Sequence, residues 1–255
     1  GMTTSAASYD HTFFSDMREG SASSARVIVP MLQERLDFSS VVDVGCGTGA
    51  WLSAFAACGV GDYFGLDGDW AAKAGLEIPR ERFMAVDLAA PPTLGRRFDL
   101  AISLEVAEHL PASAAARFVS ALGDLAPVVL FPAAIPGQGG TSHINEQWPD
   151  YWSERFAARG YACFDVLRLL LWNQPGVQWW YAQNMLIFAD RAALGSYPRL
   201  TACVPSGSAV APPLRLVHPG CLAAATAKPL ELGRIVRAAP GALKRAILAQ
   251  LGRRG

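Results

Sequence analysis

A glycine-rich loop that follows a buried strand constrains the fold of this chain more than any other feature of its sequence. The stretch VVDVGCGTGAW spans residues 41–51 and contains Gly45, Gly47 and Gly49. Glycine allows a tight turn and lets a ligand come close to the backbone. The helix expected after the loop offers unpaired N–H groups at its start to an anionic group. The pattern therefore predicts a ligand-binding turn between a strand and a helix.

Short apolar runs alternate with helix-like stretches along the first two thirds of the chain. Strands are expected at residues 40–45, 63–67, 82–88, 98–104 and 127–134, and helices at 21–36 with a break or bend near Pro30, 50–58, 112–125 and 147–159. Strands that alternate with helices in this way are typical of an α/β fold with a mainly parallel sheet.

The pattern changes after residue 160. Two long β-like runs, 161–172 and 177–190, are separated by a segment that contains NQPG, a sequence typical of turns. They predict an antiparallel pair of strands at the edge of the sheet. Residues 195–230 are rich in Pro, Ala, Ser and Gly and are expected to be irregular, whereas residues 241–252 predict a short basic amphipathic helix.

Composition and charge exclude several classes of protein. A hydrophobic content of 51% provides a sizeable core and excludes general disorder. The 22 basic and 22 acidic residues cancel, so nucleic-acid binding is not expected. The five cysteines contain no CxxC pair, which argues against a zinc site or a disulfide framework. Neither a secretion signal nor a membrane-spanning run is visible. We therefore expect a cytoplasmic protein without membrane contact, and homo-oligomer formation stays open.

Carboxylates stand at the ends of the first three predicted strands. They are Asp43, Asp67 and Asp87. Open α/β sheets bind ligands at the carboxyl ends of their strands. Carboxylates accept hydrogen bonds from hydroxyl and amine groups, so the three residues suit a cationic ligand that carries such groups. The alternative for Asp43 and Asp87 is that each caps a turn.

The sequence resembles the class I S-adenosylmethionine-dependent methyltransferases in four stretches. These are VVDVGCGTGAW, YFGLDGD, FMAVDLAAP and FDLAISLEVAEHLP, which occur in the order and spacing of that family. The resemblance implies a Rossmann-like, doubly wound sheet of seven strands with an antiparallel last pair, and S-adenosyl-L-methionine as the cofactor. It covers residues 25–190, preceded by an N-terminal cover segment at 1–24 and followed by a Pro/Ala-rich extension at 191–255.

Carried onto this sequence, the resemblance also implies a set of cofactor-binding residues. The glycine loop would pass the amino-acid part of the cofactor, Asp67 would accept the ribose hydroxyls, and Asp87 would accept the adenine amine. The residues after the fourth strand would lie near the methionyl part. The full set is Asp43, Gly45, Cys46, Gly47, Gly49, Asp67, Gly68, Asp87, Leu88, Ser103, Leu104 and Glu105.

A polar segment after the fifth predicted strand is the expected acceptor site. Within residues 131–152, His143 is the first candidate for a base because its pKa can lie near neutral pH, with Glu146 beside it. His109, in EVAEHLP, is the competing candidate. Each of these could instead have a structural role. The expected acceptor-binding side chains are Asn145, Trp148, Tyr151 and Trp152. His143 and Glu146 lack a visible third ligand, so no metal site is expected.

These observations predict an enzyme that transfers a methyl group to a small molecule, at oxygen, with a saccharide as one form of acceptor. The Asn/Asp-Pro-Pro-Tyr/Phe signature of adenine- and glutamine-modifying enzymes is replaced here by Ser103-Leu104-Glu105-Val106. Two alternatives stay open. The spacing of Gly45, Gly47 and Ala50 fits a dinucleotide fingerprint and hence an NAD(P)-dependent oxidoreductase. The other alternative is a non-catalytic binding protein that keeps the fold.

Overall fold

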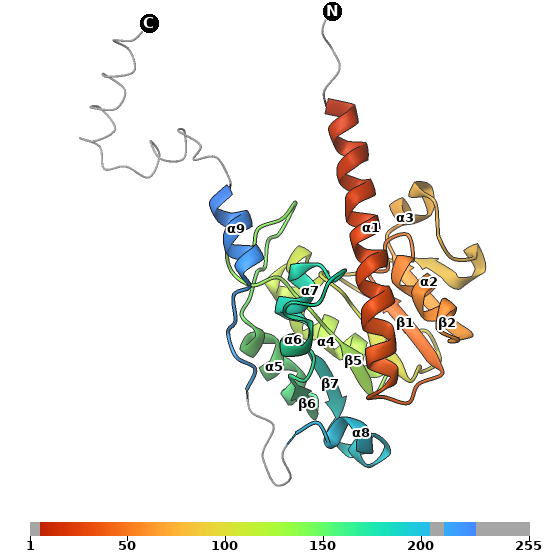
Figure 1. Cartoon of the computed structure of the whole chain (residues 1–255). Helices are drawn as coiled ribbons and strands as arrows, with labels where there is room; N and C mark the ends of the chain where they lie inside the picture. The colour runs from red at the N-terminus through yellow and green to blue at the C-terminus, as the bar shows by residue number, and fades with distance from the viewer. Residues whose placement is uncertain (1–5, 205–211, 228–255) are drawn as a thin grey trace, which may run out of the picture.

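A seven-stranded sheet forms the centre of the computed structural model (Figure 1), which describes residues 6–204 and 212–227, with side chains from residue 19 onward. The strands are β1 (Ser40–Val44), β2 (Asp62–Asp67), β3 (Phe83–Ala85), β4 (Leu100–Ile102), β5 (Val128–Leu130), β6 (Tyr161–Phe164) and β7 (Ile187–Asp190). Their order is β3-β2-β1-β4-β5-β7-β6. The first five are parallel, and β7 runs antiparallel to both β5 and β6. The predicted fold class is confirmed.

Helices cover both faces of this sheet. They are α1 (Ala6–Gln33), α2 (Ala50–Ala57), α3 (Asp69–Ala74), α4 (Ala115–Leu125), α5 (Pro149–Ala158), α6 (Arg168–Leu171), α7 (Trp179–Asn184), α8 (Pro198–Thr201) and α9 (Pro219–Ala227). Short 3₁₀ turns occur at Arg80–Arg82, Ala107–His109, Ala112–Ala114 and Arg191–Ser196. None of the described helices is both long enough and apolar enough to cross a membrane.

The strands are buried on both faces, which explains their nearly continuous apolar sequences. Val41 and Leu100 belong to the core cluster that includes α1 and α2, whereas their neighbours Val42 and Ala101 belong to the cluster that includes α4 and α5. Successive side chains of a strand point to opposite faces, so each central strand contributes to both clusters. Figure 1 shows α1 beside α2 on one face of the sheet.

The first helix differs from its prediction. The sequence suggested a helix at 21–36 that is broken or bent near Pro30, and a separate cover segment before it. In the structure one continuous helix, α1, runs through Pro30 and ends at Gln33. Ile28 and Leu32 lie four residues apart on its buried face and have no exposed surface. Packing of this face against the sheet outweighs the helix-breaking preference of proline, which is worth about 3 kcal/mol in a helix interior.

The two long strands predicted at 161–172 and 177–190 are wrong in length. Only their outer ends, β6 and β7, are strands, and these do pair antiparallel. The residues between them include α6 and α7, so WWYAQN (179–184) forms a helix and not an edge strand. Leu167 and Leu171 are both buried at helical spacing. A short apolar run does not distinguish a strand from a buried helix. The sequence pattern therefore predicted strands where the structure has helices.

The described part of the segment after β7 contains more regular structure than its composition suggested. It contains α8 and α9 within the range expected to be irregular. Arg168, which has no exposed surface, donates a hydrogen bond to the backbone oxygen of Leu214 at 2.8 Å. Arg215 forms an ion pair with Asp150 of α5. These contacts fasten residues 212–227 to the domain. The helix predicted at 241–252 lies outside the described residues.

Candidate functional site

A cavity of about 740 Å³ opens at the carboxyl ends of β1, β2 and β4. The strand order reverses between β1 and β4, and open α/β sheets bind ligands at such a switch point. Nine residues that the sequence predicted as site residues line this cavity. They are Asp43, Gly45, Cys46, Gly47, Asp67, Leu88, Leu104, Glu105 and His109.

The glycine loop adopts a backbone conformation that favours glycine at three positions. Gly45, Gly47 and Gly49 have φ angles of 93°, 53° and 94°. The N–H groups of Gly45 and Cys46 both donate to the backbone oxygen of Leu66 in β2, at 2.7 and 3.1 Å. A Cβ atom at Gly45 would lie 2.3 Å from Cγ2 of Val106. The loop is therefore held between β2 and the segment after β4 with no room for a side chain at Gly45.

Substituting Gly45 by alanine is expected to destabilise the protein more than substituting Gly47. Both positions have a positive φ, which costs an L-residue about 1–2 kcal/mol. Only Gly45→Ala adds a clash, because Gly47 has no atom within 4 Å of an added Cβ. Overpacking costs about 1–3 kcal/mol more. Urea unfolding of the two variants and the unsubstituted protein measures this difference, and equal free energies of unfolding for both variants would contradict the geometry.

Asp43 presents an unpaired carboxylate oxygen to the cavity. The residue is 2% exposed, and its Oδ1 has no hydrogen-bond partner among the described residues. Burial and then the neighbouring Asp67 charge raise the pKa of Asp43 well above its usual value. A buried polar atom without a partner is costly. Asp43 is thus suited to a ligand that brings a cation or a hydrogen-bond donor to this end of the cavity.

Asp67 ends β2 and ties the glycine loop to it. Its Oδ2 accepts a hydrogen bond from the N–H of Gly47 at 2.7 Å, and its Oδ1 accepts from the N–H of Gly68 at 2.6 Å. The indole Nε1 of Trp70 also donates to Oδ1, at 3.1 Å. Burial raises the pKa of Asp67, although these three donors oppose that shift. The carboxylate has a lone pair left for a ligand.

Four residues of the predicted cofactor set do not line the cavity. Gly49 is the N-cap residue before α2, and Gly68 donates its N–H to Asp67. Asp87 is exposed, and its side chain caps a turn by accepting from the N–H of Ala89 at 2.9 Å. Ser103 is buried and donates to the backbone oxygen of Val44 at 2.8 Å. The structure therefore places Ser103 between β1 and β4, where it supports the site without lining it.

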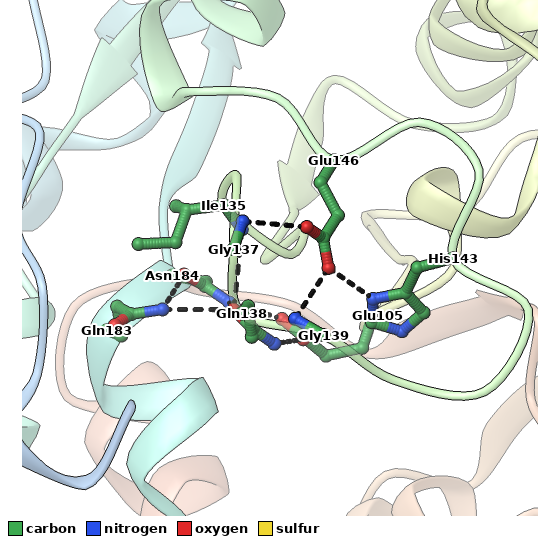
Figure 2. A network of polar contacts seen from close by, with 9 residues as sticks. All are labelled: Glu105, Ile135, Gly137, Gln138, Gly139, His143, Glu146, Gln183 and Asn184. Atoms are coloured by element: carbon green, nitrogen blue, oxygen red, sulfur yellow. Dashed lines mark hydrogen bonds and ion pairs between the residues drawn. The ribbon is translucent and has the colours of Figure 1, made fainter. Parts of the chain in front are cut away.

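Glu105 is part of a largely buried polar network (Figure 2). Its Oε1 accepts from Asn184 at 2.8 Å and its Oε2 accepts from Gln138 at 2.7 Å. Gln138 Oε1 in turn accepts from Gln183 and Asn184, both at 2.9 Å. Burial raises the pKa of Glu105 to about 7, although these hydrogen bonds oppose the shift.

The backbone of Glu105 has a φ of 56°. A non-glycine residue held in this left-handed region costs of order 1–3 kcal/mol, and such residues cluster at functional sites. The conformation places Glu105 both in the cavity wall and against Gln138 and Asn184. The segment between β5 and α5 and the helix α7 thus hold this carboxylate in place.

The two candidate histidines lie side by side but differ in their access to the cavity. His109 lines it, whereas His143 does not. The ring centroids are 4.8 Å apart at an interplanar angle of 88°. Partial burial and the neighbouring His143 lower the pKa of His109. His143 Nδ1 is 2.9 Å from Glu146 Oε1, and Glu146 accepts from the N–H groups of Gly137 and Gly139 at 2.8 and 2.7 Å (Figure 2).

The four predicted acceptor residues also lie outside the cavity wall. Trp152 is 2% exposed and packs on Phe131 in the core. Asn145 is buried, and its Oδ1 accepts from Gln147 at 2.9 Å. Tyr151 lies under the guanidinium of Arg155, and Trp148 lies under that of Arg215. The geometry gives these four residues supporting positions around α5.

Aromatic residues that were not among the predicted site residues complete the cavity wall. Trp51, Trp70, Trp180 and Tyr181 all line it, together with Ser21 of α1. Tyr181 packs edge-on against Trp51 with ring centroids 5.2 Å apart, and its hydroxyl is 3.2 Å from Ser21 Oγ. The cluster of aromatic residues near position 180 is evident in the sequence. Its prediction as a strand, however, did not indicate that these residues lie beside the glycine loop.

The residues present fit S-adenosylmethionine. The cofactor carries a sulfonium and an ammonium, which suit the unpartnered Asp43 oxygen, and a ribose diol, which suits Asp67. The glycine loop allows close approach to its backbone. Leu88, Leu104 and the aromatic residues offer apolar surface for the rest of the molecule.

Comparisons with known proteins agree with this site. A family model described as a methyltransferase domain matches residues 17–189, which is more than half of the chain. No curated protein gives a significant match to the sequence.

Solved structures share the fold at low sequence identity. The sugar N-methyltransferase KedS8 from Streptoalloteichus sp. has a TM-score of 0.53 at 16% identity, covering 75% of this chain and 95% of its own. CalS10, an amino pentose methyltransferase from Micromonospora echinaspora solved with S-adenosylmethionine bound, has a TM-score of 0.50 at 18% identity, covering 74% and 99%. DesVI of Streptomyces venezuelae has a TM-score of 0.43 at 21% identity, and 55% of this chain matches 62% of the DesVI chain.

Proposed function

The chain belongs to the class I S-adenosylmethionine-dependent methyltransferases, and from this membership we propose that it methylates a hydroxyl group of a small molecule, specifically of a saccharide. When bound, S-adenosylmethionine supplies a methyl group on a positively charged sulfur. The chain's own residues then have three tasks. They bind the cofactor, exclude water from the reacting atoms, and draw the proton from the acceptor hydroxyl.

The observation that carries the proposal is the position of His109 at the wall of the cofactor cavity. A hydroxyl group is a weak nucleophile until its proton is drawn away, and histidine is the side chain most often used for this near neutral pH. The lowered pKa of His109 keeps its ring neutral, with a lone pair available. We place the acceptor hydroxyl beside His109. The ring of His143 packs edge-on against the ring of His109 and supports its position.

The aromatic wall supports a small acceptor with flat or apolar faces. Trp51, Trp180 and Tyr181 border the same cavity. Aromatic rings offer an apolar face, and their N–H and O–H groups keep a polar handle, a combination suited to sugar rings. The printed descriptions of KedS8 and CalS10 name sugar and amino-pentose methyltransferases, which gives the saccharide proposal a parallel on the same fold.

An amino group of a sugar is the second candidate acceptor. The names of KedS8 and CalS10 favour it, because both describe nitrogen-containing chemistry. The oxygen acceptor fits this chain better, since a neutral amine needs no help in losing a proton before attack whereas a hydroxyl does. The NAD(P) alternative has lost its support, because the sheet contains an antiparallel strand and the chain belongs to a methyltransferase family.

Methyl transfer to a panel of acceptors tests the proposal. Purified full-length protein is incubated with isotopically labelled S-adenosylmethionine and, in parallel, with nucleotide-activated neutral sugars, nucleotide-activated amino sugars, and a single-stranded RNA. Label is expected in the neutral sugars, with the methylated position located by mass spectrometry and NMR. Label only in the amino sugars would replace oxygen by nitrogen as the acceptor, and label only in RNA would refute the small-molecule proposal.

A further inference from the structure

Three potential metal ligands gather next to the cofactor cavity. They are Glu108 and His109, in the 3₁₀ turn after β4, and His143, in the segment between β5 and α5. One ligand atom from each lies within 4.8 Å of the other two. The two segments are joined by hydrogen bonds from the N–H groups of Ile144 and Asn145 to the backbone oxygen of Glu108, at 2.9 and 3.0 Å.

The side chain of Glu108 is fully buried next to the carboxyl group of Glu105. The residue has no exposed surface, and neither carboxylate oxygen has a hydrogen-bond partner among the described residues. Buried charged groups in proteins are paired or coordinate a metal, because an isolated buried charge is very costly. A bound cation would give these oxygens a ligand-bond partner.

His143 is oriented in the way that metal-binding histidines are. Its Nδ1 is hydrogen-bonded to Glu146, which the N–H groups of Gly137 and Gly139 hold in place (Figure 2). A carboxylate on one ring nitrogen fixes the tautomer and leaves the other nitrogen as a ligand. A Cβ at Gly140 would fall 2.3 Å from His143 Nε2. Gly140 therefore packs against the Nε2 edge of the ring, and a larger residue at this position would cover the nitrogen that would coordinate.

We propose that Glu108, His109 and His143 bind a divalent first-row transition-metal ion beside the cofactor cavity. Two imidazoles and one carboxylate form a donor set that suits Zn²⁺, Mn²⁺ and Fe²⁺ and leaves coordination positions open. Ligand bonds of about 2.0–2.2 Å place no two donor atoms more than about 4.4 Å apart. The ion would thus draw the ligand atoms slightly closer together.

The role of the ion rests on the proposed function. An open coordination position facing the cavity would bind the acceptor hydroxyl and lower its pKa, as metal ions do for bound water. In the metal-bound protein His109 would hold the ion and would not accept the proton itself, so the hydroxyl proton would leave to solvent. The oxygen then forms the new carbon–oxygen bond while the bond between the methyl carbon and sulfur breaks, and the sulfur keeps that electron pair.

Calorimetric titration of the full-length chain with metal ions tests the site. Protein freed of metal with a chelator is titrated separately with Zn²⁺, Mn²⁺ and Mg²⁺. One ion is expected to bind per chain, with Zn²⁺ or Mn²⁺ binding more tightly than Mg²⁺. Glu108→Gln, His109→Ala and His143→Ala should each weaken binding at least 100-fold. Glu146→Gln should weaken it about 10–100-fold, as loss of a supporting carboxylate does elsewhere.

His218→Ala is the matched control. This imidazole lies on the C-terminal segment, where its Nε2 contacts the backbone oxygen of Trp172 at 2.7 Å, so the variant should bind metal like the unsubstituted protein. Glu108→Gln keeps the side-chain shape, so circular dichroism should show a folded protein. Absence of metal binding to the unsubstituted chain would overturn the proposal. Metal affinities of the three ligand variants equal to that of the unsubstituted chain would do the same.

Titration with Co²⁺ gives a spectroscopic check that does not depend on activity. Visible absorption bands of protein-bound Co²⁺ should appear with the unsubstituted chain and be lost in His143→Ala. Methyl transfer to the acceptor panel, measured on the same samples, separates the two proposals. Metal binding without methyl transfer to any acceptor would leave the metal site standing and reject the proposed function. Methyl transfer that survives full removal of metal would reject the role of the ion.

Discussion

Replacing His109 by alanine is expected to lower the rate of methyl transfer by about 10²–10⁴-fold, the usual effect of removing a group that handles the substrate proton. Among the described histidines, His109 is the one that lines the cofactor cavity. Its neutral ring offers a lone pair at the cavity wall. That lone pair would accept the acceptor's proton or, in the metal-bound protein, hold the ion that binds the acceptor. The effect should appear in kcat, because the lost interaction acts on the reacting group.

The affinity for S-adenosylhomocysteine serves as the internal control for this variant. It should stay nearly unchanged, because the cofactor's charged groups and ribose are assigned to Asp43 and Asp67. His218→Ala removes an imidazole that is remote from the cavity and should keep full turnover. If His109→Ala is active while His143→Ala is inactive, His143 is the acting residue, as the sequence alone suggested.

Replacing Asp67 by alanine is expected to weaken S-adenosylhomocysteine binding by at least tenfold. Two effects contribute. The ribose hydroxyls lose their acceptor, and hydrogen bonds to a charged group contribute about 1.5–3 kcal/mol each. The N–H groups of Gly47 and Gly68 also lose the carboxylate that fixes the glycine loop to the end of β2. Calorimetric titration with S-adenosylhomocysteine measures the change.

Asp69 provides the matched control for Asp67. It lies two residues away on α3, is solvent-exposed, and pairs with Lys73 on the surface. Exposed pairs of this kind contribute little to stability, so Asp69→Ala should bind S-adenosylhomocysteine as the unsubstituted protein does. Asp67→Asn keeps a neutral acceptor and should fall between the two. Unchanged affinity in a folded Asp67→Ala variant would reject the assignment of the ribose to this residue.

Much of the cofactor half of the site could be read from the sequence because its signals are local. The strand, the glycine loop and the helix at residues 40–57 are consecutive, and each is specified by its own residues: β-branched side chains, glycines at positive φ, and a helical apolar face. Parallel strands place their carboxyl ends at one edge, so Asp43 and Asp67 had to come close together once the fold class was fixed.

The acceptor half depended on contacts between distant segments. Both histidines were visible in the sequence, but the sequence did not show which of them lines the cavity. That depends on how the segment between β5 and α5 folds back onto the turn after β4. The hydrogen bonds of Ile144 and Asn145 to Glu108 decide this. Trp152 illustrates the same limit, since only the packing of α5 on the sheet shows that it belongs to the core.

The sequence by itself therefore determined the fold class, the glycine loop and the carboxylates at the ends of β1 and β2, because hydrophobic period and glycine placement act over a few neighbouring residues. Only the tertiary structure decided that residues 179–184 form a helix whose Tyr181 closes the cavity, and that Gln138 and Asn184 hold Glu105. It also decided that Glu108, His109 and His143 meet. These contacts join residues up to 160 positions apart, and no local pattern specifies such a pairing.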